Sequence, residues 1–147
     1  MTSNIWIRPA SRDDSSDIAM LLGQLGYPTD PVAVMTRLGR VEATGLDQIL
    51  VAEEQEQIVG VAALHIIPAL IHQQGPLAQI TAIVVDEQRL REGIGRQLLE
   101  TAEELARNAG CYGIEISSNA QRTAVHTFYE TLGYTQSSFL FRKVLHR

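Results

Sequence analysis

The sequence is short of cysteine, of positive charge and of long apolar runs. Its single cysteine, Cys111, can form no internal disulfide and stands at the start of a predicted strand, so we expect a small buried hydrophobic residue in a reducing compartment. No apolar run approaches the roughly 20 residues of a membrane span, and the polar start at 1–4 lacks the features of a secretion signal. We therefore expect a cytoplasmic protein with no membrane partner.

Positive charge is scarce as well. The 147 residues contain 12 Lys and Arg against 17 Asp and Glu, a formal net charge of -5. Because nucleic acids usually bind to a basic patch, this balance argues against a DNA or RNA partner, and any anionic ligand must be held locally. The His and Cys residues show no metal-ligand spacing, so we expect no metal.

What is present is an ordinary globular composition, with 45% hydrophobic and 20% charged residues. A chain of this length can bury a sizeable core, and no linker, internal repeat or low-complexity tract divides it. We predict a single domain over residues 1–147.

Apolar patterning predicts both strands and helices. Runs of β-type residues predict strands at 5–8, 49–53, 58–67, 77–85, 111–117 and 134–145. Apolar residues at helical spacing predict helices at 11–25, 30–41, 93–109 and 123–132. A hairpin followed by a strand–helix–strand unit indicates an α/β (α+β) fold with a mixed sheet.

A Gly-Ile-Gly at 93–95 follows the strand at 77–85 and opens the next helix. Without side chains at Gly93 and Gly95, backbone N–H groups there can approach an anion such as pyrophosphate, and the helix dipole favours it. Leu98 stands where a dinucleotide fingerprint needs its third glycine, and no Gly-Lys-Ser/Thr follows as in a nucleoside triphosphate loop. A tight connection without a ligand is the alternative reading.

Two stretches resemble the GNAT superfamily of N-acetyltransferases. The segment 83–99 is similar to its motif A, in which the turn wraps the pyrophosphate of coenzyme A. The segment 124–134, with its Phe-Tyr-Glu and Leu-Gly-Tyr, is similar to the helix and turn before the last strands of that superfamily. Ile-Arg-Pro-Ala at 7–10 and Val-Gly-Val at 59–61 extend the resemblance. The Leu64-His65 strand, the loop with His72, Ser117-Ser-Asn119, Arg122 and the stretch 139–145 look most like small single-domain members such as the aminoalkylphosphonate N-acetyltransferases.

The resemblance implies a GNAT-like fold, with a mixed and mostly antiparallel sheet of six to seven strands flanked by about four helices. It also implies an enzyme that moves an acetyl group from acetyl-coenzyme A directly to a primary amine of a small molecule. A protein or peptide acceptor is one alternative, and a coenzyme A-binding domain without transfer is another. The sequence does not name the acceptor, and a homodimer paired through 139–141 is open.

The resemblance assigns the coenzyme site residue by residue. The pantetheine would run along the strand, and the thioester carbonyl would meet a backbone N–H near Val84 or Val85. Arg91 and Arg96 would add charge to the phosphates, and Asn119 would bond the pantetheine amides. The implied cofactor contacts are Ile83, Val84, Val85, Arg91, Glu92, Gly93, Ile94, Gly95, Arg96 and Asn119.

Tyr129 occupies the tyrosine position of the Phe-Tyr-Glu segment, where many relatives use the hydroxyl as general acid to the departing thiolate. A core tyrosine is the alternative. Transfer also needs a base, because an amine with a pKa near ~10.4 is mostly charged at neutral pH. The candidates are His65 and Glu115 on strands and His72 in a loop, and a packed histidine, an ion-paired glutamate or a solvated loop residue explains them equally well.

The chain departs from the family pattern at two positions. Leu90 stands where Gln or Arg usually precedes the first glycine by three residues, with Arg89 and Arg91 on either side. Backbone amides can still bind phosphate without that side chain. Gln79 stands near the position of the frequent strand glutamate, so the carboxylate base of the family cannot be carried over to this chain.

Overall fold

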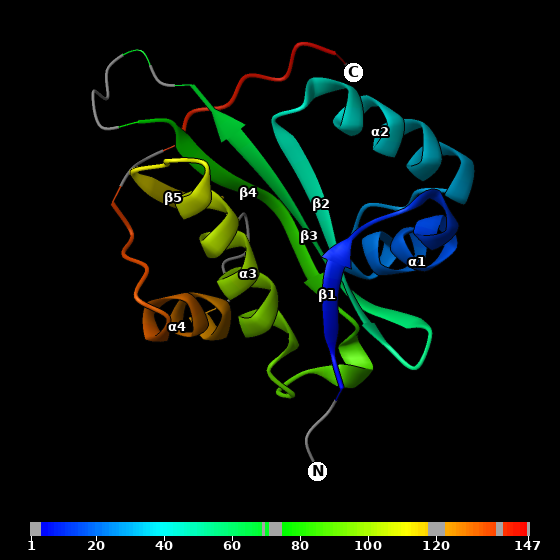
Figure 1. Cartoon of the computed structure of the whole chain (residues 1–147). Helices are drawn as coiled ribbons and strands as arrows, with labels where there is room; N and C mark the ends of the chain where they lie inside the picture. The colour runs from blue at the N-terminus through cyan, green and yellow to red at the C-terminus, as the bar shows by residue number, and fades with distance from the viewer. Residues whose placement is uncertain (1–3, 69, 71–74, 118–122, 138–139, 147) are drawn as a thin grey trace. The chain divides into compact units, whose positions relative to one another are not determined.

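The computed structural model describes residues 4–68, 70, 75–117, 123–137 and 140–146 (Figure 1). The chain divides into two compact units, an N-terminal unit over 1–117 and a C-terminal unit over 118–147. The single domain expected over residues 1–147 therefore stays a prediction.

The N-terminal unit is built on one five-stranded sheet in the order β1-β2-β3-β4-β5. The strands are β1 (Trp6–Pro9), β2 (Asp47–Glu54), β3 (Gln57–Ile67), β4 (Leu77–Val85) and β5 (Gly113–Ile116). All neighbours are antiparallel except β4 and β5, which are parallel because a helical crossover joins them. The α/β fold class with a mixed, mostly antiparallel sheet is thus confirmed.

The described residues contain four α-helices and two short 3-10 turns. They are η1 (Arg12–Asp14), α1 (Ser15–Leu25), α2 (Pro31–Thr44), η2 (Glu87–Arg89), α3 (Ile94–Asn108) and α4 (Thr123–Thr131). The start of α2 shows the predicted chemistry, because the Asp30 carboxylate accepts from Ala33 N at 2.8 Å and Pro31 takes the first helical position.

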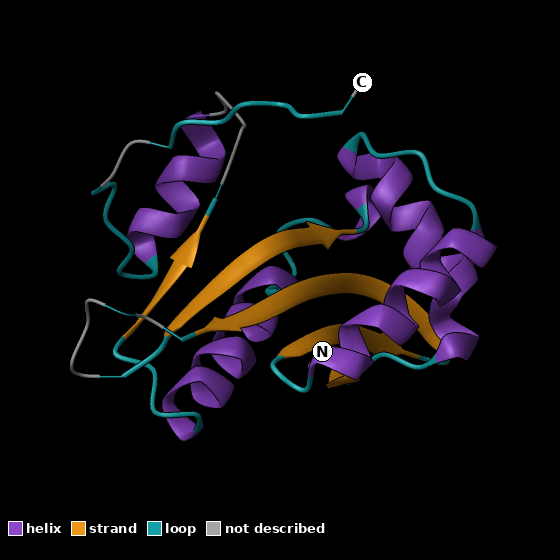
Figure 2. Cartoon of the chain, turned by 90° about the horizontal axis from the view of Figure 1, so that it is seen from above, coloured by secondary structure: helices purple, strands orange, loops and turns teal. Residues whose placement is uncertain are grey.

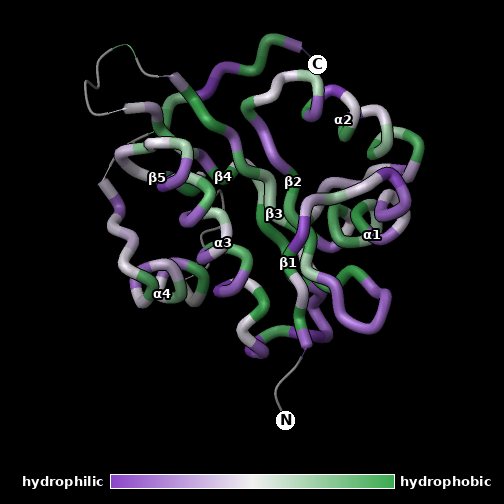
Figure 3. The backbone as a smooth tube through the Cα atoms, in the orientation of Figure 1, coloured by the Kyte–Doolittle hydropathy of each residue, from purple (hydrophilic) through white to green (hydrophobic). Residues whose placement is uncertain are grey.

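In the N-terminal unit, α1 and α2 lie on one side of the sheet and α3 on the other (Figure 1), and Figure 2 shows the curved strands between these helices. Apolar residues follow the central strands (Figure 3). Val61 and Val84 belong to the core cluster that contains Ile18 and Leu21 of α1. Gly60, the residue before Val61 on β3, faces Ile94 and Leu98 of α3, because successive residues of a strand face opposite sides of the sheet.

The prediction of strands at 134–145 is wrong for the residues of this segment that the structure describes. Residues 135–137 and 140–146 have no regular structure, so the described residues form five strands rather than six or seven. Apolar and β-branched residues favour a strand only where a backbone ladder forms with a partner, and composition does not supply that partner. The predicted end of α4 is correct, since Gly133 has a φ of 93° and Tyr134 N donates back to Tyr129 O.

Among the described residues, no helix combines the length and the apolar character needed to cross a bilayer.

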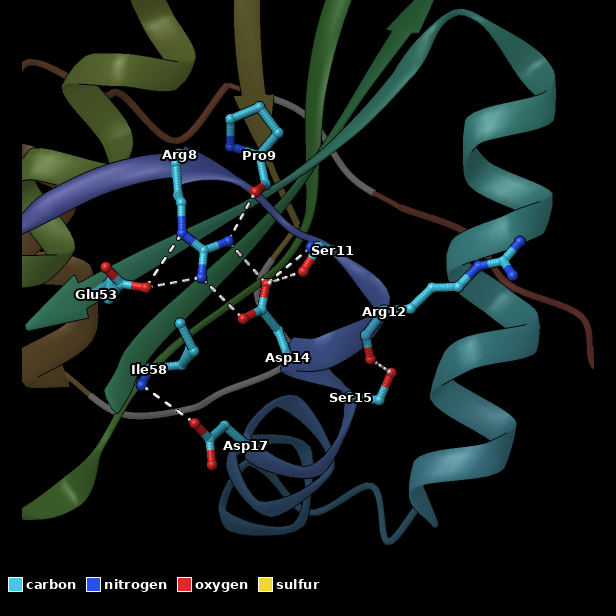
Figure 4. A network of polar contacts seen from close by, with 9 residues as sticks. All are labelled: Arg8, Pro9, Ser11, Arg12, Asp14, Ser15, Asp17, Glu53 and Ile58. Carbon is cyan, nitrogen blue, oxygen red and sulfur yellow. Dashed lines mark hydrogen bonds and ion pairs between the residues drawn. The ribbon is translucent and has the colours of Figure 1, made fainter. Parts of the chain in front are cut away.

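Arg8 joins three segments of the N-terminal unit (Figure 4). Its guanidinium donates to both carboxylate oxygens of Asp14 at 2.8 Å and to Glu53 Oε1 at 2.9 Å, which ties β1 to β2 and to the start of α1. Asp14 also accepts from Ser11 N at 2.7 Å, and only 7% of its side chain is exposed. The hydrogen bonds from Arg8 hold the pKa of Asp14 below its usual value.

Replacing Arg8 by methionine should lower the free energy of unfolding at pH 7 by about 3 kcal/mol, because it leaves the buried Asp14 carboxylate without its cation. Urea unfolding measures this difference. Arg12→Met is the matched control: Arg12 is exposed and its side chain has no ion pair with a described residue, so a change within about 0.5 kcal/mol is expected.

The pH dependence has a defined sign. A carboxylate whose pKa is lowered in the folded state stabilises the protein above its unfolded pKa of about 3.9, and this contribution disappears as the pH falls through the folded pKa. The stability difference between the wild type and Arg8→Met should therefore shrink below about pH 4. An equal difference at pH 7 and pH 3 would contradict the role of the Arg8–Asp14 pair.

Candidate functional site

The turn between β4 and α3 presents backbone donors that the helix does not use. The first helical hydrogen bond runs from Gln97 N to Gly93 O at 3.1 Å, so the N–H groups of the three residues at 94–96 precede the helical ladder. Gly93, the N-cap, has a φ of 83° and carries no side chain that could bond them. The 15-residue helix adds the positive end of its dipole. The predicted anion site therefore has the donors it needs.

Arg89 holds this turn, although it is not among the predicted site residues. Its guanidinium donates to Glu54 Oε1 on β2 at 2.6 Å and from Nε to both carboxylate oxygens of Glu92 at 3.0 Å. Glu92, a predicted cofactor contact, therefore uses its carboxylate within the turn. The three-residue spacing of Arg89 and Glu92 is the signal in the sequence that could have indicated this pair.

The two predicted phosphate-binding arginines differ in their surroundings. Arg91 is exposed, has a φ of 67° and makes no ion pair with another described residue. Arg96 Nε lies 3.0 Å from Glu100 Oε1, with 64% of the Arg96 side chain exposed. Arg91 could thus bind a ligand phosphate directly, whereas Arg96 would first have to break its weak, exposed ion pair with Glu100.

Helix α1 also contacts the start of the turn. Gln24 Oε1 accepts from Glu87 N at 2.9 Å, and Gln24 Nε2 donates to Asp86 Oδ1 at 3.4 Å. Asp86 N in turn donates to Val59 O of β3 at 2.9 Å. The chain therefore leaves β4 along a path fixed by both the sheet and α1.

Strands β4 and β5 pair over only the first part of β4. Their register runs from Leu77 with Gly113 to Ile80 with Ile116, and the described residues of β5 pair with nothing in 81–85. At the same place Thr81 is an extra residue of β4, a β-bulge, because the register with β3 shifts there. The predicted pantetheine path at 83–85 thus lies on an edge of β4 whose peptide groups lack a strand partner among the described residues.

The candidate bases lie on the sheet of the N-terminal unit. His65 Nδ1 of β3 contacts Asp47 Oδ1 of β2, so His65 has a polar partner that sequence reasoning missed. Glu115 is exposed on β5. The register of the strands places both in one row with Asp47 and Gln79.

Two predicted residues, Asn119 and the loop residue His72, lie outside the described part of the chain. Tyr129 lies in α4 of the C-terminal unit, with its ring centroid 5.6 Å from that of Phe128 and 6.1 Å from that of Tyr134. Burial raises the pKa of the Tyr129 hydroxyl, so it stays protonated at neutral pH.

Cys111 is half-buried, and burial raises the pKa of its thiol. A thiol that resists ionisation is a poor nucleophile, which agrees with the predicted structural role. In the described part of the chain, no group of three or more His, Cys, Asp or Glu side chains could hold a metal ion.

A pocket of about 840 Å³ lies at the other end of β4 and α3. Its lining includes Asp47, Leu64, Ile66, Pro76 and Leu105. The predicted coenzyme contacts of the turn are not part of this lining.

The sequence matches the family model described as acetyltransferase (GNAT) family over residues 18–134. This chain belongs to the GNAT family of acetyltransferases. Members of this family use acetyl-coenzyme A. The turn at 93–96, whose N–H groups no side chain caps, is the segment where the resemblance predicts that coenzyme A binds.

This GNAT chain is 39% identical over 89 residues to the aminoalkylphosphonate N-acetyltransferase of Salmonella typhimurium, a match that covers 60% of this chain and 57% of that protein. Matches to three curated relatives cover between 55% and 59% of their lengths, so the chain spans somewhat more than half of each.

Solved structures share the fold over nearly the whole chain. A transcriptional regulator from Bacillus halodurans has a TM-score of 0.88 and 25% identity, covering 97% of this chain and 100% of that chain. The aminoglycoside N-acetyltransferase AAC(6')-Iy in complex with CoA has a TM-score of 0.82, covering 97% of both chains. At 18% identity, the second likeness shows the fold alone.

Arg89→Met should weaken the binding of coenzyme A by up to about tenfold, because the turn would then have to be ordered on binding. Isothermal titration calorimetry measures the dissociation constant. Arg107→Met is the control, since it removes an exposed ion pair with Glu103 near the other end of α3. Equal dissociation constants for both variants would show that Arg89 does not organise the turn.

Proposed function

We propose that this chain is an acetyl-coenzyme A-dependent N-acetyltransferase that moves an acetyl group to a primary amine of a small molecule by direct transfer. The observation that carries the proposal is the set of N–H donors at 94–96 that no side chain caps, together with the edge of β4 at 81–85, which has no strand partner on the β5 side among the described residues. Every helix leaves its first N–H groups without a helical partner, so the support comes from the combination of these donors with an open strand edge and not from the donors alone.

The residues fit the two chemically distinct parts of coenzyme A. The donors of Ile94, Gly95 and Arg96, with the charge of Arg91, suit a pyrophosphate. The peptide groups at 83–85 suit the amides of a pantetheine arm, which would add to the edge of β4 much as an extra strand does. In this proposal, Asn119 supplies a further hydrogen bond to the same amides.

The backbone of β4 also suits the stabilisation of an oxyanion. The Val84 side chain is 9% exposed and belongs to the core beneath α1, so this residue offers a ligand its backbone and not its side chain. In the proposed reaction, the N–H of Val84 or Val85 bonds the carbonyl oxygen of the acetyl thioester as negative charge develops there. No charged side chain is needed for this step.

Proton transfer is assigned to side chains. Tyr129 is the proposed general acid toward the departing thiolate, and the raised pKa of its hydroxyl keeps the proton in place until it is needed. His65 is the proposed base that receives the proton of the amine, with Glu115 as the second candidate. Both candidates lie on the sheet near the end of the β4–β5 pairing.

Aminoalkylphosphonates are the first acceptors to test, because a relative named for them is 39% identical over 89 residues. Release of free thiol from acetyl-coenzyme A should be followed over a panel of aminoalkylphosphonates, polyamines, amino acids and aminoglycosides. We expect turnover with at least one small amine. Binding of acetyl-coenzyme A without turnover on any amine would favour a domain that binds without transfer, and acetylation of peptide amines alone would favour the protein-directed alternative.

Tyr129→Phe should lower kcat by about 10²- to 10⁴-fold, the typical contribution of a general acid, while the dissociation constant of coenzyme A stays unchanged. Steady-state kinetics and calorimetry separate the two effects. Tyr134→Phe is the control, because it removes a hydroxyl from the same group of rings. Near-normal turnover in Tyr129→Phe would remove Tyr129 from the mechanism and leave it as a core residue.

A homodimer also stays a proposal. Leu140 and Phe141 are 65% and 94% exposed, which is the kind of apolar segment that a second copy of the chain would cover. Analytical ultracentrifugation of the purified chain decides between monomer and dimer.

A further inference from the structure

Four polar residues lie in one row across the sheet. The register pairs Asp47 of β2 with His65 of β3, His65 with Gln79 of β4, and Gln79 with Glu115 of β5. Residues paired on neighbouring strands project from the same face of a sheet, so the four side chains share one face. The row has a carboxylate at each end.

The row lies on the face of the sheet that α1 and α2 cover. Val61 belongs to the core beneath these helices, and strand alternation keeps Ala63 and His65 on the face of Val61. Beyond that apolar core the face becomes polar, and 40% of the His65 side chain is exposed. A small molecule can therefore reach His65 from the side of the sheet opposite α3.

The row also lies next to the opening between β4 and β5. Gln79 and Glu115 stand one pair before the last pair of the two strands, and the bulge at Thr81 follows. Neighbouring strands are about 4.8 Å apart, so the backbone of β3 at His65 is one strand spacing from β4 at this opening. An amine that enters the opening from the α1–α2 face meets Gln79 and Glu115 at the opening, with His65 one strand farther across the same face.

Asp47 determines which nitrogen of His65 is free to accept a proton. The contact of Asp47 is with Nδ1, and only 17% of the Asp47 side chain is exposed. Asp47 Oδ1 is buried and accepts no hydrogen bond from another described group, so a proton on Nδ1 is the donor that this oxygen lacks. With the proton on Nδ1, the lone pair of the ring is on Nε2.

We propose that the row Asp47–His65–Gln79–Glu115 is the site of the acceptor amine, with Asp47 as the positioning residue that keeps His65 Nε2 free to accept the proton of the amine. Glu115, exposed at the other end of the row, attracts the ammonium form of the acceptor. This inference rests on the proposed transfer function.

The transfer step then balances. The ammonium form gives one proton to Nε2, and the lone pair that this leaves on nitrogen forms the new N–C bond to the acetyl carbon. As the amide forms, the nitrogen releases a second proton to water, which balances the proton that Tyr129 gives up. The C–S bond of the thioester breaks, its electron pair stays on sulfur, and the proposed acid Tyr129 protonates the thiolate.

The test compares Asp47→Ala, Asp47→Glu and Glu42→Ala in the full chain. Asp47→Ala should lower kcat by about 10- to 100-fold, as loss of an orienting partner typically does, with the dissociation constant of coenzyme A unchanged. Asp47→Glu should recover part of that loss. Glu42→Ala removes an exposed carboxylate of α2 that lines the same pocket as Asp47 but makes no ion pair with His65 among the described residues, and it should leave kcat unchanged.

A ¹⁵N spectrum of the His65 ring supplies a readout that does not need turnover. We expect the tautomer with the proton on Nδ1 in the wild type and a mixture of tautomers in Asp47→Ala. An unchanged tautomer in Asp47→Ala would overturn the positioning role, even in a chain that acetylates no amine, where the failure of the transfer function would be seen separately.

The location of the acceptor is tested with 2-aminoethylphosphonate as the probe. Its addition should shift the ring signals of His65 if the row is the amine site. A chain that acetylates this amine while the His65 signals stay unshifted would overturn the assignment of the row.

Discussion

Helix α3 can lie against the sheet in this way because β3 has no side chain at residue 60. A Cβ on Gly60 would lie 3.0 Å from Leu98 Cδ1 and 3.1 Å from Ile94 Cγ2, distances at which one of the partners would have to move. Ile94 and Leu98 are almost completely buried, so this contact fixes the first turns of the helix. Because the donors of the anion site follow from Ile94 onward, the same contact sets their position relative to β4.

The site thus combines a rigid part with a polar, exposed part. Packing of α3 on the sheet holds the donors at 94–96, and the pair of Arg89 with Glu54 ties the preceding turn to β2. On the other face, the row that includes Asp47 and His65 consists of side chains that are partly open to solvent. The proposed ligands differ in what they need. The coenzyme requires preorganised backbone donors, whereas the small amine requires access from solvent and a group that accepts its proton.

Local sequence signals predicted the elements that carry the site. The apolar spacing after Gly93 predicted α3, and Asp30-Pro31 predicted the start of α2, because both depend on residues close together in the chain. The strands at 134–145 were wrong because a strand also needs a pairing partner, which residue type does not reveal. The contacts Arg89–Glu54 and Asp47–His65 were missed because strand register brings together residues that are far apart in sequence.

The proposed function requires the turn at 93–96 to bind the pyrophosphate of coenzyme A. A titration of the ¹⁵N-labelled chain with coenzyme A, followed through the backbone amide signals, tests this binding most directly. The largest shifts should occur at Ile94, Gly95 and Arg96, with smaller shifts at Val84 and Val85. Unchanged signals at the turn, with the largest shifts at the pocket beside Leu64 and Leu105, would contradict it.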